Sequence, residues 1–173
     1  GSVGVPIAYF LAKGGAKVAV VDKHASPGRG QNRAAIGGVR ATHSDPAKIQ
    51  LCLDSIRVFS TWREEHGDDI GWKMGGYCFP AYREREEGVL RGLLPTQKSH
   101  GLGIDWVDPA GIEDLIPGIA REGLRGGTFS PGDGQASPLR TVNAIARAAE
   151  VLGATFRYRE RVTGFGMEKG KVR

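Results

Sequence analysis

The sequence contains few cysteines, no block of like charges and no long apolar run. Its cysteines, Cys52 and Cys78, do not form a C-x-x-C pair, which excludes a disulfide scaffold and a zinc ribbon, and we predict no metal site. We expect both to be reduced core thiols. Although the net charge is +5, no run of five Lys/Arg occurs, so the charge pattern does not indicate nucleic-acid binding. No apolar stretch approaches the roughly 18 residues that a membrane span requires.

The sequence also lacks an initiator Met, a basic leader segment and a strand before its first turn. There is no initiator Met, and no basic segment precedes the apolar residues 3–12, so a secretory signal is not indicated and we expect a cytoplasmic protein. A glycine-rich turn at residues 1–4 has no strand before it, and the chain stops at Arg173 inside an expected hairpin. We therefore expect a fragment of a longer protein.

Glycine is the residue in excess. It occupies 27 of 173 positions, whereas the average protein has about 7%. The glycines follow no strict period, which excludes collagen. Hydrophobic residues make up 40% of the chain and charged residues 25%, and six Phe, four Tyr and three Trp are present. This composition is typical of a folded globular protein and not of a disordered one.

The N-terminal residues match part of a dinucleotide-binding turn. Gly1 and Gly4 fit the second and third glycines of G-x-G-x-x-G, followed by an apolar helix over 3–12 and a buried strand over 17–22. In such a turn the glycines allow close approach to a pyrophosphate, which the helix N-terminus attracts. Asp22 ends the strand, 18 residues after Gly4, where a carboxylate binds ribose hydroxyls. An ordinary turn with a surface Asp is the alternative.

The loop over 23–40 is long, polar and rich in small residues. Its backbone amides and arginines could surround a phosphate. A plain NAD-binding unit would continue directly into another helix, so this loop favours a flavin over a nicotinamide. A loop without a cofactor role stays open as the alternative.

Four segments together resemble a known family: the opening turn, Asp22, the stretch 32–40 and the motif 133–138 (Asp-Gly-Gln-Ala-Ser-Pro). They resemble the D-amino-acid-oxidase superfamily of FAD-dependent oxidoreductases, in the branch of glycine oxidase, the sarcosine oxidase β-subunit and dimethylglycine-dehydrogenase-like proteins. The resemblance covers residues 1 to 165. It implies an α/β fold: a glutathione-reductase-like Rossmann domain that binds FAD, with an inserted antiparallel α+β substrate domain. The expected segments are 1–71 and 132–173 for the FAD domain and 72–131 for the substrate domain.

The resemblance also implies which residues bind FAD. Those expected at the pyrophosphate are Gly1, Ser2, Val3, Gly4 and, in the surrounding loop, Gln31, Asn32 and Arg33. Asp22, with Lys23 beside it, is expected at the adenosine ribose. Those expected at the isoalloxazine are Gly37, Gly38, Val39 and Arg40. The backbone of Val162, in an expected strand over 161–165, matches the position that contacts adenine.

No catalytic residue is assigned. His43 is a candidate base without a visible partner, and no Cys or His can be assigned a covalent flavin linkage. The family oxidises the C–N bond of an amino acid or N-methyl amino acid by hydride transfer to the flavin and passes the electrons to O₂ or another acceptor. Arg40 is expected to favour the reduced, anionic flavin, or else to bind the loop backbone.

Three other interpretations stay open. An NAD(P)-dependent dehydrogenase uses the same turn, and a flavoprotein-like subunit or assembly factor of a hetero-oligomer would bind FAD without catalysis. An inert truncation product is the third. The expected partners of the enzyme are a small amine or amino-acid substrate and an electron acceptor.

The rest of the chain alternates between expected helices and strands. Helices are predicted over 45–66, 84–100, 109–115 and 138–152, and strands over 70–74, 76–80, 124–129 and 155–161.

Overall fold

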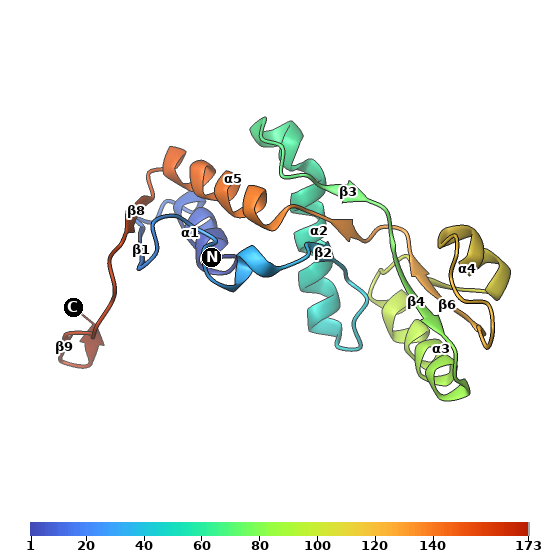
Figure 1. Cartoon of the computed structure of the whole chain (residues 1–173). Helices are drawn as coiled ribbons and strands as arrows, with labels where there is room; N and C mark the ends of the chain where they lie inside the picture. The colour runs from blue at the N-terminus through green and yellow to red at the C-terminus, as the bar shows by residue number, and fades with distance from the viewer. Residues whose placement is uncertain (173) are drawn as a thin grey trace. The chain divides into compact units, whose positions relative to one another are not determined.

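The computed structural model describes residues 1–172, which form two compact units (Figure 1). The first unit comprises Gly1–Gly37, His66–Gly71 and the chain from Ser137 onward, and the second comprises Gly38–Glu65 and Trp72–Ala136. Residues 38–65, which we expected in the FAD domain, thus cluster with 72–136 in this chain. The assignment of 72–131 to an inserted substrate domain stays a prediction.

The first unit is built on a parallel strand pair. β1 (Ala19–Asp22) pairs with β8 (Thr155–Tyr158), in register from Ala19 opposite Thr155 to Asp22 opposite Tyr158. Helix α1 (Gly4–Lys13) precedes β1, and helix α5 (Pro138–Val151) precedes β8. Each strand therefore follows a helix, and the two helices pack side by side (Figure 1). This arrangement agrees with the predicted α/β architecture.

The packing of α1 on α5 follows from their apolar faces. Both helices bury residues spaced three or four apart, the spacing that places side chains on one helical face. The buried residues are Val5, Ala8, Tyr9 and Ala12 of α1 and Val142, Ala144, Ile145, Ala146 and Ala149 of α5. Most of them are small, which allows the helices to approach closely. Fully burying each larger aliphatic side chain contributes about 1.5–3 kcal/mol.

The second unit contains an antiparallel sheet flanked by helices. Its strand order is β4-β6-β5, formed by β4 (Tyr77–Ala81), β6 (Gly126–Ser130) and β5 (Asp105–Val107). Helices α3 (Glu84–Ser99) and α4 (Pro109–Leu115) contact β6 (Figure 1). The long helix α2 (Pro46–His66) contributes Ile49 to a buried cluster with Ala41, Leu102 and Ile104.

A short ladder in the same unit brings three distant segments together. β7 (Gly134–Gln135) lies between β2 (Gly38–Val39) and β3 (Lys73–Met74), and both pairings are antiparallel. The segment before Arg40 is thereby fixed beside the turn that leads into β4.

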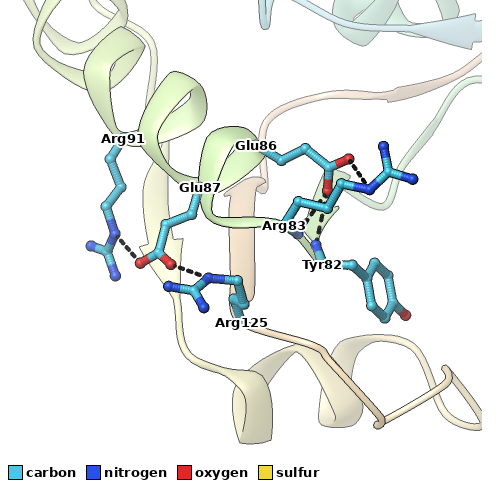
Figure 2. Close-up of polar contacts among 6 residues, drawn as sticks. All are labelled: Tyr82, Arg83, Glu86, Glu87, Arg91 and Arg125. Atoms are coloured by element: carbon cyan, nitrogen blue, oxygen red, sulfur yellow. Dashed lines mark hydrogen bonds and ion pairs between the residues drawn. The ribbon is translucent and has the colours of Figure 1, made fainter.

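Two adjacent glutamates anchor the start of α3. One carboxylate oxygen of Glu86 accepts the backbone N–H groups of Tyr82 and Arg83 at 3.0 and 3.1 Å (Figure 2). Glu87 binds Arg91, one turn along the helix, and Arg125, just before β6. These hydrogen bonds lower the pKa of both carboxyl groups. The stabilisation is therefore present at neutral pH and is lost as acid protonates the carboxylates.

Most of the predicted elements are confirmed within a few residues, but the strand over 161–165 is wrong. Residues 161–166 lie in neither a helix nor a strand, and the Val162 side chain is 55% exposed. The β-branched and aromatic residues there have no neighbouring strand in the described part of the chain, and such residues form a strand only where they find one. The expected terminal hairpin does form, from β9 (Met167–Glu168) and β10 (Lys171–Val172).

A membrane span requires a helix of sufficient length and hydropathy. Among the helices of residues 1–172, none is both long and apolar enough to cross a membrane.

Gly134 provides a test of the β2-β7-β3 ladder. A Cβ there would lie 2.3 Å from the carbonyl oxygen of Lys73, which would force the strands apart. We expect Gly134→Ala to lower the free energy of unfolding by about 2–3 kcal/mol, measured by denaturant titration. The matched control is Gly132→Ala, whose Cβ would meet no described atom within 4 Å and should change stability by less than about 1 kcal/mol. Equal effects would contradict this packing.

Candidate cofactor-binding site

The N-terminus of α1 presents unsatisfied amides. Hydrogen bonding along the helix begins with the Val5 N–H, which donates to the Gly1 carbonyl at 3.1 Å. The N–H groups before Val5 have no acceptor inside the helix. In the described chain no side chain caps this end, and its first turn holds no acidic residue. The α1 N-terminus is therefore electropositive and suited to an anion.

Space around this end is open. A Cβ built on Gly1 or Gly4 would meet no described atom within 4 Å, and Ser2 and Val3 are exposed. The four residues predicted to bind the pyrophosphate therefore lie on an accessible surface beside free amide donors.

Asp22 lies at the carboxyl end of β1. Its Oδ1 accepts the backbone N–H of His24 at 2.9 Å, which orients the carboxylate. The following chain is held in place because the Asp22 and His24 carbonyls accept the N–H groups of Glu160 and Arg159. Since α1 runs back to the start of β1, the N-terminus of α1 and the carboxyl end of β1 lie at the same edge. The two features that recognise an adenosine pyrophosphate thus occur in one unit.

The loop after Lys23 is partly ordered by α5. A short 3₁₀ helix, η1 (Gln31–Ala34), contacts α5, and the Asn32 side-chain amide donates to the Pro138 carbonyl at 2.9 Å. Asn32 therefore anchors this loop, whereas Gln31 and Arg33 are exposed. Gly28, at φ +74°, allows close contact because its Cβ would lie 2.7 Å from Val142 Cγ1.

These residues fit an FAD molecule at its adenosine and pyrophosphate ends. Open glycines, uncapped helix amides and a carboxylate with its Oδ2 available are the groups that such a ligand requires. Val162 lies on an exposed segment outside the regular structure, and its backbone contact with the adenine stays a prediction.

Arg40 belongs to the second unit, directly after β2. Its Nη1 donates to the carbonyl of Thr42, and its guanidinium lies 5.8 and 5.3 Å from the ring centroids of Tyr77 and Phe79. The alternative we considered, binding to the loop backbone, is thus present in this structure. Its contact with a flavin stays a prediction, as do those of Gly37, Gly38 and Val39.

A cavity of about 240 Å³ adjoins Arg40. Polar and apolar side chains line it together: Arg40, Thr42, His43, Ser44, Phe79, Leu90, Leu93, Gln97 and Thr128. Burial lowers the pKa of His43, and the charges of Arg40 and Lys48 lower it further. The lowered pKa favours the neutral imidazole, the form that can accept a proton. A role of His43 as a base stays a prediction.

The sequence did not identify one buried polar residue of this region. Asp133 is fully buried, and its Oδ1 accepts the N–H of Ala41 at 2.9 Å. The motif 133–138 contributed to the family resemblance, but only the pairing of β7 with β2 brings Asp133 next to Arg40. Within residues 1–172, no group of three or more His, Cys, Asp or Glu is arranged to hold a metal.

Comparison with known proteins supports the same interpretation. The family described as "FAD dependent oxidoreductase" (DAO) matches residues 1–173. Mitochondrial dimethylglycine dehydrogenase of Rattus norvegicus is 26% identical over 163 residues, which cover 94% of this chain and 19% of that protein. Glycine oxidase of Geobacillus kaustophilus is 30% identical over 161 residues, covering 89% of this chain and 42% of that protein.

Solved structures show the same fold. L-Proline dehydrogenase from P. horikoshii superimposes with a TM-score of 0.94 at 27% identity, covering 99% of this chain and 45% of that one. Glycine oxidase from Bacillus cereus gives a TM-score of 0.82 at 27% identity, covering 99% and 47%. The chain thus spans less than half the length of these relatives. The predicted fold class, family resemblance and FAD cofactor are confirmed.

A charge placed at the α1 N-terminus tests the pyrophosphate site. Ser2→Asp should weaken FAD binding about tenfold, because ~1.4 kcal/mol of repulsion is expected between the carboxylate and the phosphates. The same charge stabilises the helix, so the melting temperature should stay equal or rise. Both are measured by flavin fluorescence titration and thermal denaturation.

The control is the neutral, nearly isosteric Ser2→Asn, which should change the affinity for FAD by less than about threefold, ~0.7 kcal/mol. Equal weakening by Asn and Asp, or none by Asp, would show that the phosphates bind elsewhere.

Proposed function

Because the chain belongs to the DAO family of FAD dependent oxidoreductases, we propose that it carries the FAD-binding part of an enzyme that oxidises the C–N bond of an amino acid or N-methyl amino acid. The observation that carries this proposal is in the first unit. There the uncapped N-terminus of α1 and the carboxylate of Asp22 lie at the same edge. This pair matches a dinucleotide with a pyrophosphate and a free ribose.

The chain's own residues would bind and orient the cofactor. The amides at the start of α1 would donate to the pyrophosphate, and Asp22 Oδ2 would accept a hydrogen bond from a ribose hydroxyl. Bound FAD supplies the chemistry by accepting a hydride from the carbon attached to the substrate nitrogen. Arg40 would place a positive charge beside the ring, and O₂ or another acceptor would remove the electrons.

The names of the relatives define a substrate class to test. Dimethylglycine, glycine and L-proline appear in the names given above, and sarcosine in that of human mitochondrial sarcosine dehydrogenase, which is 28% identical over 155 residues. All are α-amino acids, and three of them carry an N-alkyl group. We therefore propose a glycine- or sarcosine-like amino acid as the substrate.

Among the alternatives, an NAD(P)-dependent dehydrogenase is disfavoured by the long loop over 23–40 and by the family match. A non-catalytic FAD-binding subunit or assembly factor shares every feature of the cofactor site. It differs only in the response of the bound flavin to an amine.

The function is tested on the full-length protein. Fluorescence titration should show saturable binding of FAD and none of NAD. Anaerobic addition of sarcosine, dimethylglycine, glycine or L-proline should then bleach the flavin absorbance near 450 nm, as expected for two-electron reduction. Bound FAD that none of these amino acids reduces would favour the non-catalytic subunit, and binding of NAD without FAD would overturn the proposal.

Arg40 gives a second test of the same proposal. If its guanidinium lies beside the ring, Arg40→Ala should lower the flavin midpoint potential, because a positive charge stabilises the reduced anion. Arg40→Lys retains the charge and is expected to lower the potential less. An unchanged potential in Arg40→Ala would show that Arg40 serves only the loop backbone.

A further inference from the structure

Asp133 joins three segments of the second unit. Its carboxylate Oδ1 accepts the Ala41 N–H at 2.9 Å. Its backbone carbonyl accepts the N–H groups of Gly75 and Gly76 at 3.3 and 2.8 Å. It lies between β6 and β7 and is fully buried. The segment after β2, the turn before β4 and the start of β7 thus meet at one residue.

The other carboxylate oxygen is incompletely satisfied. Asp133 Oδ2 and the neighbouring Ser130 Oγ are buried, and neither has a hydrogen bond of normal geometry in the described part of the chain. Burial raises the pKa of Asp133 above its ordinary value, and the Ala41 amide, the Ser130 and Thr42 hydroxyls and the charge of Arg40 offset only part of this effect. A buried carboxylate in such surroundings is costly.

An asparagine at position 133 could make the local hydrogen bonds without the free-energy cost of burying a charge. It has the same shape, its Oδ1 could accept the Ala41 N–H, and its amide could donate to Ser130 Oγ. Local geometry alone therefore does not explain a carboxylate here. Arg40 is the nearby positive charge that favours the ionised form of Asp133 and so lowers its pKa in part.

The contacts link Asp133 to Arg40 through two residues. Ala41, whose N–H the carboxylate holds, follows Arg40 directly in the chain. Thr42, whose carbonyl holds the Arg40 guanidinium, comes next. Asp133 therefore both fixes the backbone that carries Arg40 and places a negative charge near it.

We propose that Asp133 is a positioning residue that acts through Arg40: its carboxylate fixes Arg40 and offsets part of the positive charge that Arg40 presents to an anion. This inference rests on the proposed function, in which that anion is the reduced flavin. Asp133 then limits how strongly the site stabilises negative charge on the ring.

The test is a double-mutant cycle between Asp133→Asn and Arg40→Gln in the full-length protein with FAD bound. The probe is sulfite, which adds reversibly to the oxidised flavin through an S–N bond and leaves a negative charge on the ring. With Arg40 present, Asp133→Asn should lower the Kd for sulfite about threefold or more, as expected for two residues coupled through one hydrogen-bond network. In the Arg40→Gln background the same substitution should change it by less than ~1.5-fold.

Two results would overturn the proposal. An equal shift in both backgrounds would mean that Asp133 acts directly or through the fold in general. No shift in either would mean that its charge is not felt at the flavin.

The melting temperatures of the same four proteins are also measured without FAD. Because this measurement needs no cofactor, it tests the coupling of Asp133 to Arg40 independently of the proposed function. If Asp133→Asn destabilises the protein because Arg40 loses its partner, adding Arg40→Gln should recover part of the loss. Additive losses would assign Asp133 a purely structural role. Failure to bind FAD, in contrast, would contradict the proposed function and leave this measurement intact.

Discussion

The parallel pairing of β1 with β8 is the constraint on which the candidate site depends. It fixes the direction of β1, and the packing of α1 on α5 fixes the helix that precedes it. Together they place the α1 N-terminus and Asp22 at one edge. The free amides of α1 and the Asp22 carboxylate indicate a cofactor site only because they lie together, since either feature alone occurs in many proteins without a cofactor.

In the second unit one buried residue, Asp133, joins the segments around Arg40 through its carboxylate and its backbone carbonyl. Asp133 receives backbone N–H groups from both sides of the β2-β7-β3 ladder, so the conformation of the Arg40 segment depends on it. Arg40 in turn packs its guanidinium over Tyr77 and Phe79. In flavin enzymes the cofactor performs the chemistry and the protein tunes it, and the proposed role of Arg40 beside the ring would use this fixed positive charge.

The sequence predicted what local patterns control. Apolar periodicity located α1, α2 and α5, and a proline at the first position together with Ser137 before it marked the start of α5. The order of glycine turn, helix, strand and acid indicated a dinucleotide site, and the loop after Asp22 indicated a flavin. These features are encoded within about 40 residues of chain.

Features that depend on distant pairing could not be predicted. The role of Asp133 arises because β7 lies between β2 and β3, segments about 100 and 60 residues earlier in the chain. The strand predicted around Val162 failed for the complementary reason: its residues favour a strand, but no partner in the described chain pairs with it. The hydrogen bond from the Asn32 amide to the Pro138 carbonyl also joins distant segments, whereas the place of Asn32 at the pyrophosphate stays a prediction.

The most direct test of the account is residue-resolved NMR of this chain during titration with FAD. The account predicts that the backbone amide signals of Ser2, Val3, Gly4 and the Asp22–His24 turn shift together and saturate with a single Kd. Saturable FAD binding that leaves these amides unshifted would contradict the central claim that the start of α1 and the end of β1 form the cofactor site.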